Sequence, residues 1–176
     1  MPDLGDAGTF ALLSLPDDDD PLIDISSTSK VTGDVGVGPK GEYDLSGSAK
    51  VIGKAFLDAT VTTSITGSAD GGTIMQPFDL SQAISDAQTA AAAFGALAST
   101  QSFTDITDTA TIVGNGAVNV IAVNSIDLSG SKMLTLSGGA SDFFIFNVAD
   151  IIDFTGSSEL KLSGGVPSSH VLSQVQ

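Results

Sequence analysis

The sequence predicts a mainly β protein: an irregular right-handed β-solenoid with one long α-helix, at about residues 79–97, packed alongside. Two internal repeats support this prediction. The phrase Asp-Leu-Ser-Gly-Ser…Leu-Ser-Gly-Gly of residues 127–139 recurs, 26 residues later, as Asp-Phe-Thr-Gly-Ser…Leu-Ser-Gly-Gly in residues 153–165. The segment Val31–Val37 recurs 20 residues later as Val51–Leu57. Short strands, glycine corners and a repeat of roughly 20–50 residues are the signature of stacked structural repeats.

The N-terminal part begins with two expected strands, at residues 10–15 (FALLSL) and 22–25 (LIDI). Between them, Asp17–Asp20 is flanked by Pro16 and Pro21 and should form an exposed loop, because adjacent carboxylates repel and proline disfavours regular structure. A Ca²⁺ loop is the alternative interpretation. It needs spaced oxygen ligands and a glycine turn, which a bare acidic run does not supply. We therefore predict no metal site and no cofactor.

The next segment alternates with the period of two that a half-buried strand requires, at Val31, Val35 and Val37. A third copy of the Asp-Leu-Ser-Gly-Ser phrase occupies residues 44–48. We interpret each Gly-containing echo as a corner between stacked strands.

An Ala-rich segment, Asp79–Leu97, breaks the strand pattern and predicts the helix. Its apolar residues follow the i, i+3, i+4, i+7 spacing of one helix face. Asp79 is a suitable N-cap, and Gln82 three residues later would complete a capping-box-like pair.

The C-terminal part should return to strands. Residues 112–128 read as a strand pair with a tight turn at Asn115–Gly116. The most apolar run, Phe143–Val148, follows, and a last strand begins at His170. We expect residues 1–176 to form one domain that is truncated at its C-terminus, because the last strand stops in mid-pattern. The predicted core consists of Phe10, Leu12, Val35, Val37, Val51, Phe56, Leu57, Ile84, Phe94, Val120, Val123, Leu136, Phe144, Phe146, Phe154 and Leu162.

Composition excludes several classes of function. The net charge is −15 with only six Lys plus Arg, so we predict no nucleic-acid partner and no binding to anionic membranes. The chain has no Cys, which removes disulfides and thiol chemistry. No stretch approaches the ~20 apolar residues of a transmembrane helix, so no membrane insertion is expected.

Catalytic patterns are scarce, and we predict that the protein is not an enzyme. One His and no Cys leave few general bases or nucleophiles. Asp105/Asp108 or Asp150/Asp153 could form the carboxylate pair of a polysaccharide-active enzyme. The aspartates, however, recur at Asp-x-Ser/Thr-Gly corners, where such a side chain commonly bonds its own backbone.

A surface is the remaining candidate for function. Side chains at i and i+2 of a strand project from the same face, so short hydroxyl-bearing rows are expected on the outside of the β body. These rows are Thr60, Thr62, Ser64 and Thr66, and then Thr107, Thr109 and Thr111. A flat, rigid face with regularly spaced hydroxyl and methyl groups can order water, as adsorption to ice requires. Thr is also a good residue for any exposed strand, which is the plainer interpretation.

The order of these elements resembles the ice-binding-like family. The resemblance rests on Leu-Gly-x-Ala-Gly-x-Phe-Ala-x-Leu at residues 4–13, Val-Thr-Gly-Asp-Val-Gly-Val at 31–37, the helix, and Phe-Ile-Phe-Asn at 144–147. It implies a discontinuous β-solenoid with a long helix alongside, secreted to the extracellular space or the cell surface. It also implies that the protein is not an enzyme and that it binds ice through a flat Thr/Ser-rich β-face. Alternatives are an exported adhesion module that binds polysaccharide or protein and, more remotely, a polysaccharide-active solenoid enzyme.

Overall fold

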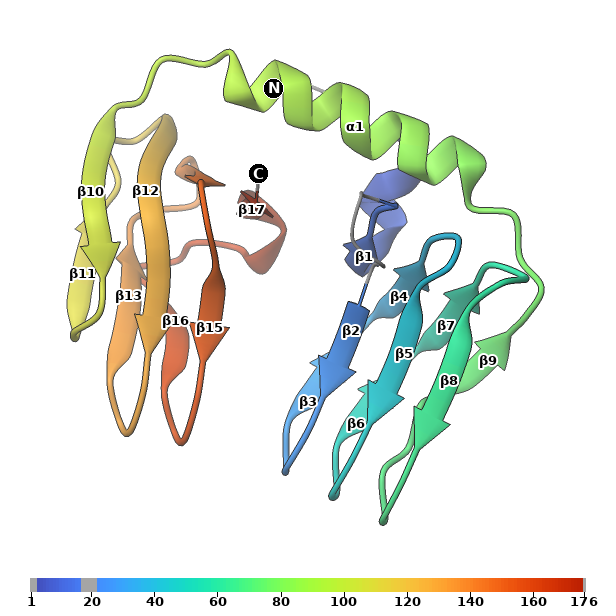
Figure 1. Ribbon diagram of the computed structural model, residues 1–176. Helices are drawn as coiled ribbons and strands as arrows, with labels where there is room; N and C mark the ends of the chain where they lie inside the picture. The colour runs from blue at the N-terminus through green and yellow to red at the C-terminus, as the bar shows by residue number, and fades with distance from the viewer. Residues whose placement is uncertain (1–2, 17–21, 176) are drawn as a thin grey trace. The chain divides into compact units, whose positions relative to one another are not determined.

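A computed structural model describes residues 3–16 and 22–175 of the chain. The predicted acidic loop Asp17–Asp20, and with it the Ca²⁺ hypothesis, lies outside the described residues. The chain divides into two compact units, Met1–Ala90 and Ala91–Gln176. Within the described residues there is a single α-helix, α1 (Ser81–Gly95), which begins in the first unit and ends in the second (Figure 1). The single-domain assignment stays a prediction.

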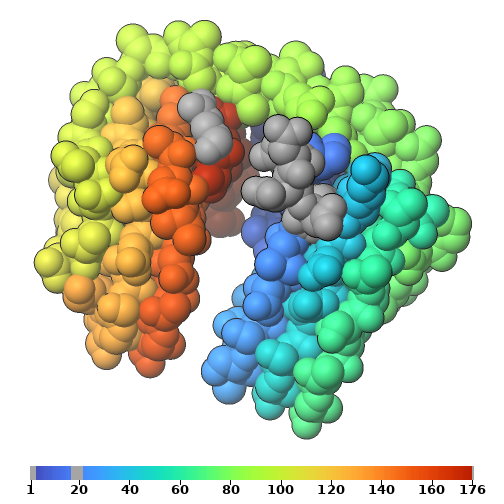
Figure 2. Space-filling view, viewed as in Figure 1, coloured from blue at the N-terminus to red at the C-terminus, as the bar shows by residue number. Residues whose placement is uncertain are grey.

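The N-terminal unit consists of parallel sheets whose neighbouring strands come from successive turns of the chain. The sheets have the orders β1-β4-β7-β9, β2-β5-β8 and β3-β6 (Figure 1). The strands are β1 (Phe10–Ser14), β2 (Leu22–Ile25), β3 (Lys30–Thr32), β4 (Asp34–Val37), β5 (Glu42–Leu45), β6 (Lys50–Ile52), β7 (Lys54–Leu57), β8 (Thr62–Ile65) and β9 (Thr73–Met75), after a 3₁₀ turn at Gly5–Thr9. In a space-filling view the successive turns form adjacent bands from blue to green (Figure 2).

The 20-residue repeat is the strand register of this unit. Val31 pairs with Val51, and Val37 pairs with Leu57, each 20 residues along. The expected continuous strand over residues 31–37 is wrong in one respect, because Gly33 (φ 124°) turns the chain between β3 and β4. Gly53 occupies the same corner one turn later. A Cβ there would overlap the Gly33 carbonyl oxygen, so the corners can stack backbone on backbone only as glycine.

Tyr43 lies at the centre of the N-terminal core and is fully buried. Its hydroxyl donates to the Gly71 carbonyl oxygen at 2.9 Å. Burial, and secondarily the negative charge of Asp70, raises the pKa of Tyr43 to about 12. Because the folded pKa lies above the ordinary value of 10.0, this residue's contribution to stability is complete below pH 10 and is lost as the pH rises through about 12.

We expect the ultraviolet titration of the phenol to show this shift directly, since Tyr43 is the only Tyr and the chain has no Trp. The folded protein should titrate near pH 12, and the urea-unfolded protein near 10. A folded-state titration near 10 would show that Tyr43 is not buried in this way.

The helix α1 is shorter than predicted by two residues at each end. Asp79 caps it as expected, accepting the Ser81 backbone N–H at 2.9 Å, and this bond lowers the pKa of Asp79. The capping-box pair does not form, because the Gln82 amide donates to Asp86 instead. The first turns of the helix bury Leu80, Ala83 and Ile84 on the outer face of the β1-β4-β7-β9 sheet, against Phe10, Leu13, Leu15 and Phe56.

The C-terminal unit has the same construction, with the sheets β10-β12-β14-β17, joined by β15 on β12, and β11-β13-β16. The strands are β10 (Gln101–Ile106), β11 (Ala110–Val113), β12 (Val118–Leu128), β13 (Met133–Ser137), β14 (Phe143–Val148), β15 (Ile152–Phe154), β16 (Glu159–Ser163) and β17 (Val171–Val175), with a 3₁₀ turn at Ser168–His170. Leu136 pairs with Leu162 and Ser137 with Ser163, so the 26-residue repeat is again a strand register.

Two expectations about this unit need correction or refinement. Asn115–Gly116 does not close a hairpin: β11 pairs with β13, and β12 pairs with β10, β14 and β15, all in parallel. The chain turns a corner there and continues to the next sheet. The last strand, β17, begins at Val171, one residue later than expected, because His170 ends a 3₁₀ turn.

The predicted core is largely confirmed. Eleven of its sixteen members are buried: Val35, Val37, Val51, Leu57, Ile84, Phe94, Val120, Val123, Leu136, Phe144 and Phe146. Phe10, Phe56, Phe154 and Leu162 are half-buried. The prediction that Leu12 is in the core is wrong, because 41% of its surface is exposed. It pairs with buried Val35, but β1 is an edge strand, so no further strand of its sheet covers it.

Candidate ligand-binding face

The first predicted hydroxyl row does not lie on one strand face. Thr60 is in the turn before β8, where its hydroxyl accepts from the Lys40 N–H (2.6 Å) and donates to Asp58 (2.7 Å). Thr66 follows the end of β8. Only Thr62 and Ser64 project together from β8. The rest of the row is interrupted because the strand is four residues long and corners flank it on both sides.

The outer face around Thr62 and Ser64 is acidic. Thr62 pairs with Glu42, and Ser64 pairs with Asp44. One turn earlier, Asp44 pairs with Asp24. Carboxylates at strand spacing, about 4.8 Å, hold their own hydration shells and repel one another. The sheet β2-β5-β8 is therefore a charged face rather than an array of hydroxyl groups.

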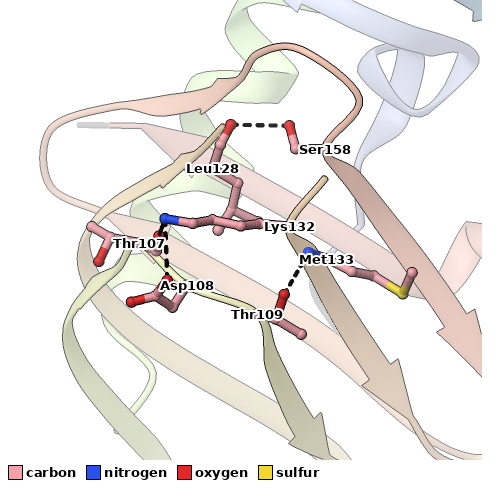
Figure 3. A network of polar contacts seen from close by, with 7 residues as sticks. All are labelled: Thr107, Asp108, Thr109, Leu128, Lys132, Met133 and Ser158. Atoms are coloured by element: carbon pink, nitrogen blue, oxygen red, sulfur yellow. Dashed lines mark hydrogen bonds and ion pairs between the residues drawn. The ribbon is translucent and has the colours of Figure 1, made fainter. Parts of the chain in front are cut away.

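The second predicted row, Thr107, Thr109 and Thr111, is also divided by a corner. Figure 3 shows Thr107 and Thr109 in the loop between β10 and β11. The Lys132 ammonium group donates to the Thr107 carbonyl oxygen and pairs with Asp108 at 3.1 Å. The Thr109 hydroxyl accepts the Met133 N–H at 3.2 Å (Figure 3). These groups fix the corner, and Thr111 alone projects from a strand.

Thr111 leads to a face that the sequence interpretation missed. In the sheet β11-β13-β16, Thr111 pairs with Thr135 and Thr135 with Lys161. The neighbouring outward column is Val113, Ser137 and Ser163. Between these columns the inward residues Ile112, Leu136 and Leu162 belong to the core. We call the outward side of these two columns the Thr/Ser face. It carries one charge, at Lys161.

Thr135 and Ser137 could have been found in the sequence. Leu134 and Leu136 alternate with them, so buried leucines imply outward hydroxyls at the positions between. Leu136 was predicted in the core, but Thr135 and Ser137 on either side of it were not among the predicted face residues. The signal that identifies the partner of Thr111 is the offset of 24 residues to Thr135, which differs from both repeats that were noticed.

A buried polar group fixes the corners at the ends of β11 and β13. Asp142, 4% exposed, accepts the N–H groups of Gly116 (2.6 Å) and Gly139 (2.8 Å), and the side-chain amide of Asn119 (3.1 Å). These bonds, first that from Gly139, lower the pKa of Asp142. The carboxylate thus holds both corners that follow the Thr/Ser face, which keeps its strands in register.

Asn119 completes this network and is fully buried. Its amide also donates to the carbonyl oxygens of Ala117 and Phe143, and its oxygen accepts the Asn115 N–H at 3.0 Å. His170 lies beside the same corner. Its ring stacks on Phe143 with centroids 3.6 Å apart, and its Nδ1 is 3.2 Å from the Asp142 carbonyl oxygen.

In one of the two carboxylate pairs considered for catalysis, Asp105/Asp108, both side chains have structural partners. Asp105 accepts hydrogen bonds from the Asn124 amide and the Ser125 hydroxyl. These bonds, the one from Asn124 most, lower the pKa of Asp105. Asp108 pairs with Lys132. No group of three His, Cys, Asp or Glu side chains able to hold a metal is found among the described residues.

The expected role of the repeated aspartates is wrong. In the repeated phrase they lie within strands β5, β12 and β15: Asp44, Asp127 and Asp153. Each lies next to buried or half-buried residues of its strand, so strand alternation places its side chain on the outer face. Turns in which a carboxylate bonds the backbone two residues on are found instead at Asp58, Asp70 and Asp79.

The fold is mainly β, with parallel sheets built from successive turns of the chain and one helix packed on a sheet. Its candidate site is an outer sheet face of small hydroxyl groups rather than a pocket. The chain belongs to the ice-binding-like family, whose family model matches residues 22–176. No curated protein matches the chain in sequence. In the part of the chain that the structure describes, helix α1 is too short and too polar to cross a membrane.

Proposed function

We propose that the protein is a non-enzymatic ice-binding module that acts outside the cell and adsorbs to ice through the Thr/Ser face. The observation that carries the proposal is the in-register pair Thr111–Thr135 beside Val113–Ser137–Ser163. The turns that present them are taken to form the irregular right-handed solenoid that the repeats predict. Strands about 4.8 Å apart give these hydroxyl and methyl groups a fixed spacing.

The other described sheets support the choice of this face. The outer side of β1-β4-β7-β9 is covered by α1. The outer side of β2-β5-β8 carries Asp24, Asp44 and Glu42, and β3-β6 carries the register pair Lys30–Lys50. Charged groups keep their own water and interrupt an ordered layer. The β11-β13-β16 sheet carries one residue of each charge, Glu159 and Lys161, both on β16, and its four hydroxyl side chains all lie in the two columns of the Thr/Ser face.

Thr135→Lys should abolish inhibition of ice recrystallisation, because it places an ammonium group at the centre of the face. Thr62→Lys is the matched control: the same change on an exposed strand residue of the acidic face should leave the inhibition unchanged. Lys161→Thr should increase inhibition, since it extends the threonine column to three strands. All three variants should keep the circular dichroism spectrum of the parent chain.

The outcome that would contradict the proposal is equal loss in both Lys variants, or loss in Thr62→Lys alone. The second result would return the activity to the row that the sequence predicted. A well-folded chain without any effect on ice would favour the adhesion alternative.

A further inference from the structure

The corner between β11 and β12 contains Asn115–Gly116, the only Asn-Gly sequence in the chain. Gly116 has a φ of 82°, in the left-handed region that favours glycine. Apart from its two chain neighbours, no described residue has an atom within 4 Å of the position that a Cβ of Gly116 would take. In an Asn-Gly sequence the backbone nitrogen reaches the preceding side-chain amide with little hindrance, because glycine has no side chain. The corner therefore brings a nucleophile and an amide together.

The Asn115 side chain is folded back over the Gly116 peptide. Its Oδ1 accepts the Ala117 backbone N–H at 2.9 Å, which closes a turn that contains the Gly116 nitrogen. The Asn115 backbone is fixed as well, since its N–H donates to Asn119 Oδ1 at 3.0 Å. A donor aimed at Oδ1 stabilises the negative charge that forms on this oxygen when a nucleophile attacks the Asn115 Cγ atom.

A carboxylate accepts the proton of the Gly116 nitrogen. The Gly116 N–H donates to Asp142 Oδ1 at 2.6 Å. Asp142 is buried, and hydrogen bonds from Gly139 and Asn119 fix its orientation. The bond from Gly139 first, and then that from Gly116, lowers the pKa of Asp142, so the group is charged at neutral pH. A charged carboxylate within hydrogen-bond reach of the proton is placed as a general base.

We propose that Asn115 is a self-modification site at which the chain deamidates through a succinimide, with Asp142 as the general base. The Gly116 nitrogen forms a bond to Asn115 Cγ while Asp142 accepts the proton. Asp142 passes this proton to the amide nitrogen of the Asn115 side chain, the bond from Cγ to that nitrogen breaks, and ammonia leaves. Water is the other reactant. It opens the ring at either carbonyl carbon and gives isoaspartate or aspartate at position 115, without any oxidation or reduction.

The other three asparagines lack this combination. Asn119 and Asn147 precede valines, whose branched side chains hinder approach to the backbone nitrogen, and their amides donate to carbonyl oxygens within the unit. Asn124 is exposed and precedes Ser125, but it lies within β12, where pairing with β10 holds the backbone extended. Asn124 is therefore the internal reference for an exposed asparagine that the fold does not activate.

Comparison of the folded and unfolded chain tests the proposal without a variant. The chain is incubated at neutral pH with and without guanidinium chloride and digested with pepsin at acid pH, and conversion at each asparagine is measured by mass spectrometry. The folded chain should convert Asn115 about tenfold faster than the unfolded chain, because only the fold supplies the general base. Asn124 should convert more slowly in the folded chain. Conversion of Asn115 that is no faster in the folded chain would overturn the proposal.

Asp142→Asn tests the proton transfer. The new amide keeps an oxygen that can accept the Gly116 N–H, but it cannot take the proton, so conversion of Asn115 should slow about tenfold. Asp105→Asn is the matched control, since this carboxylate bonds Asn124 and Ser125 instead, and it should leave conversion of Asn115 unchanged.

Circular dichroism shows whether Asp142→Asn folds, and if it does not, the comparison in guanidinium chloride decides alone. A folded Asp142→Asn variant that converts Asn115 as fast as the parent would contradict the proposal. So would a product that is aspartate alone, because water would then attack the side-chain amide directly. Isoaspartate among the products of the parent, and its slower appearance in folded Asp142→Asn, are the expected results.

Discussion

Phe144→Ala is expected to lower the free energy of unfolding by about 3–5 kcal/mol, the range for removing a large aromatic side chain from a packed core. Phe144 is fully buried in the core of the C-terminal unit. It lies on β14, between β12 and β17 in the sheet order, so neighbouring strands on both sides hold the cavity open.

Urea titration followed by far-ultraviolet circular dichroism measures this loss. Phe103→Ala is the matched control, since Phe103 is more than one-third exposed at the sheet edge and leaves no enclosed cavity. Its loss should be much smaller. Equal losses in the two variants would mean that Phe144 is not in the core, and would contradict the place of β14 between β12 and β17.

Asn119→Ala is expected to cost about 3 kcal/mol, the upper end of the range for leaving buried partners unsatisfied. The change removes hydrogen bonds to Asn115, Ala117, Asp142 and Phe143 at one corner. Asn124→Ala on the same strand is the control. Its side chain is exposed and bonds only Asp105 among the described residues, so its effect should stay within about 0.5 kcal/mol.

Asn119→Ala should also change how the free energy of unfolding depends on pH in the acid range. The folded pKa of Asp142 is lowered, so its contribution is present above the ordinary value of 3.8 and is lost as the pH falls through the folded value. Asn119→Ala removes one of the donors that lower this pKa. Acid unfolding should therefore begin at a higher pH than in the parent. An unchanged acid midpoint would show that the backbone N–H groups alone set the titration.

The repeats predicted the fold because they are the strand register. A residue and its echo 20 or 26 positions later lie side by side in adjacent strands, as Val31–Val51 and Leu136–Leu162 show. Helix periodicity located α1 to within two residues at each end. The family assignment followed from the order of these elements, and the family match confirms it.

The candidate face was harder to predict because strand alternation stops at every corner. Thr107, Thr109 and Thr111 look like one strand face in the sequence, but a corner stabilised by Lys132 separates the first two from the third. Faces in this fold are built across turns of the chain, so neighbours such as Thr111 and Thr135 are 24 residues apart. Alternation with buried leucines indicates single outward hydroxyls, but the register between strands is needed to tell which of them are neighbours, and the offsets in the C-terminal unit vary from pair to pair.

Adsorption to a single ice crystal tests the central claim most directly. An ice hemisphere grown slowly in a dilute solution of the chain, fused to a fluorescent protein, incorporates molecules that bind ice and excludes those that do not. The parent fusion should be incorporated on defined crystal planes, and the Thr135→Lys fusion should be excluded like the fluorescent protein alone. Exclusion of the parent, or incorporation of Thr135→Lys on the same planes, would contradict adsorption through the Thr/Ser face.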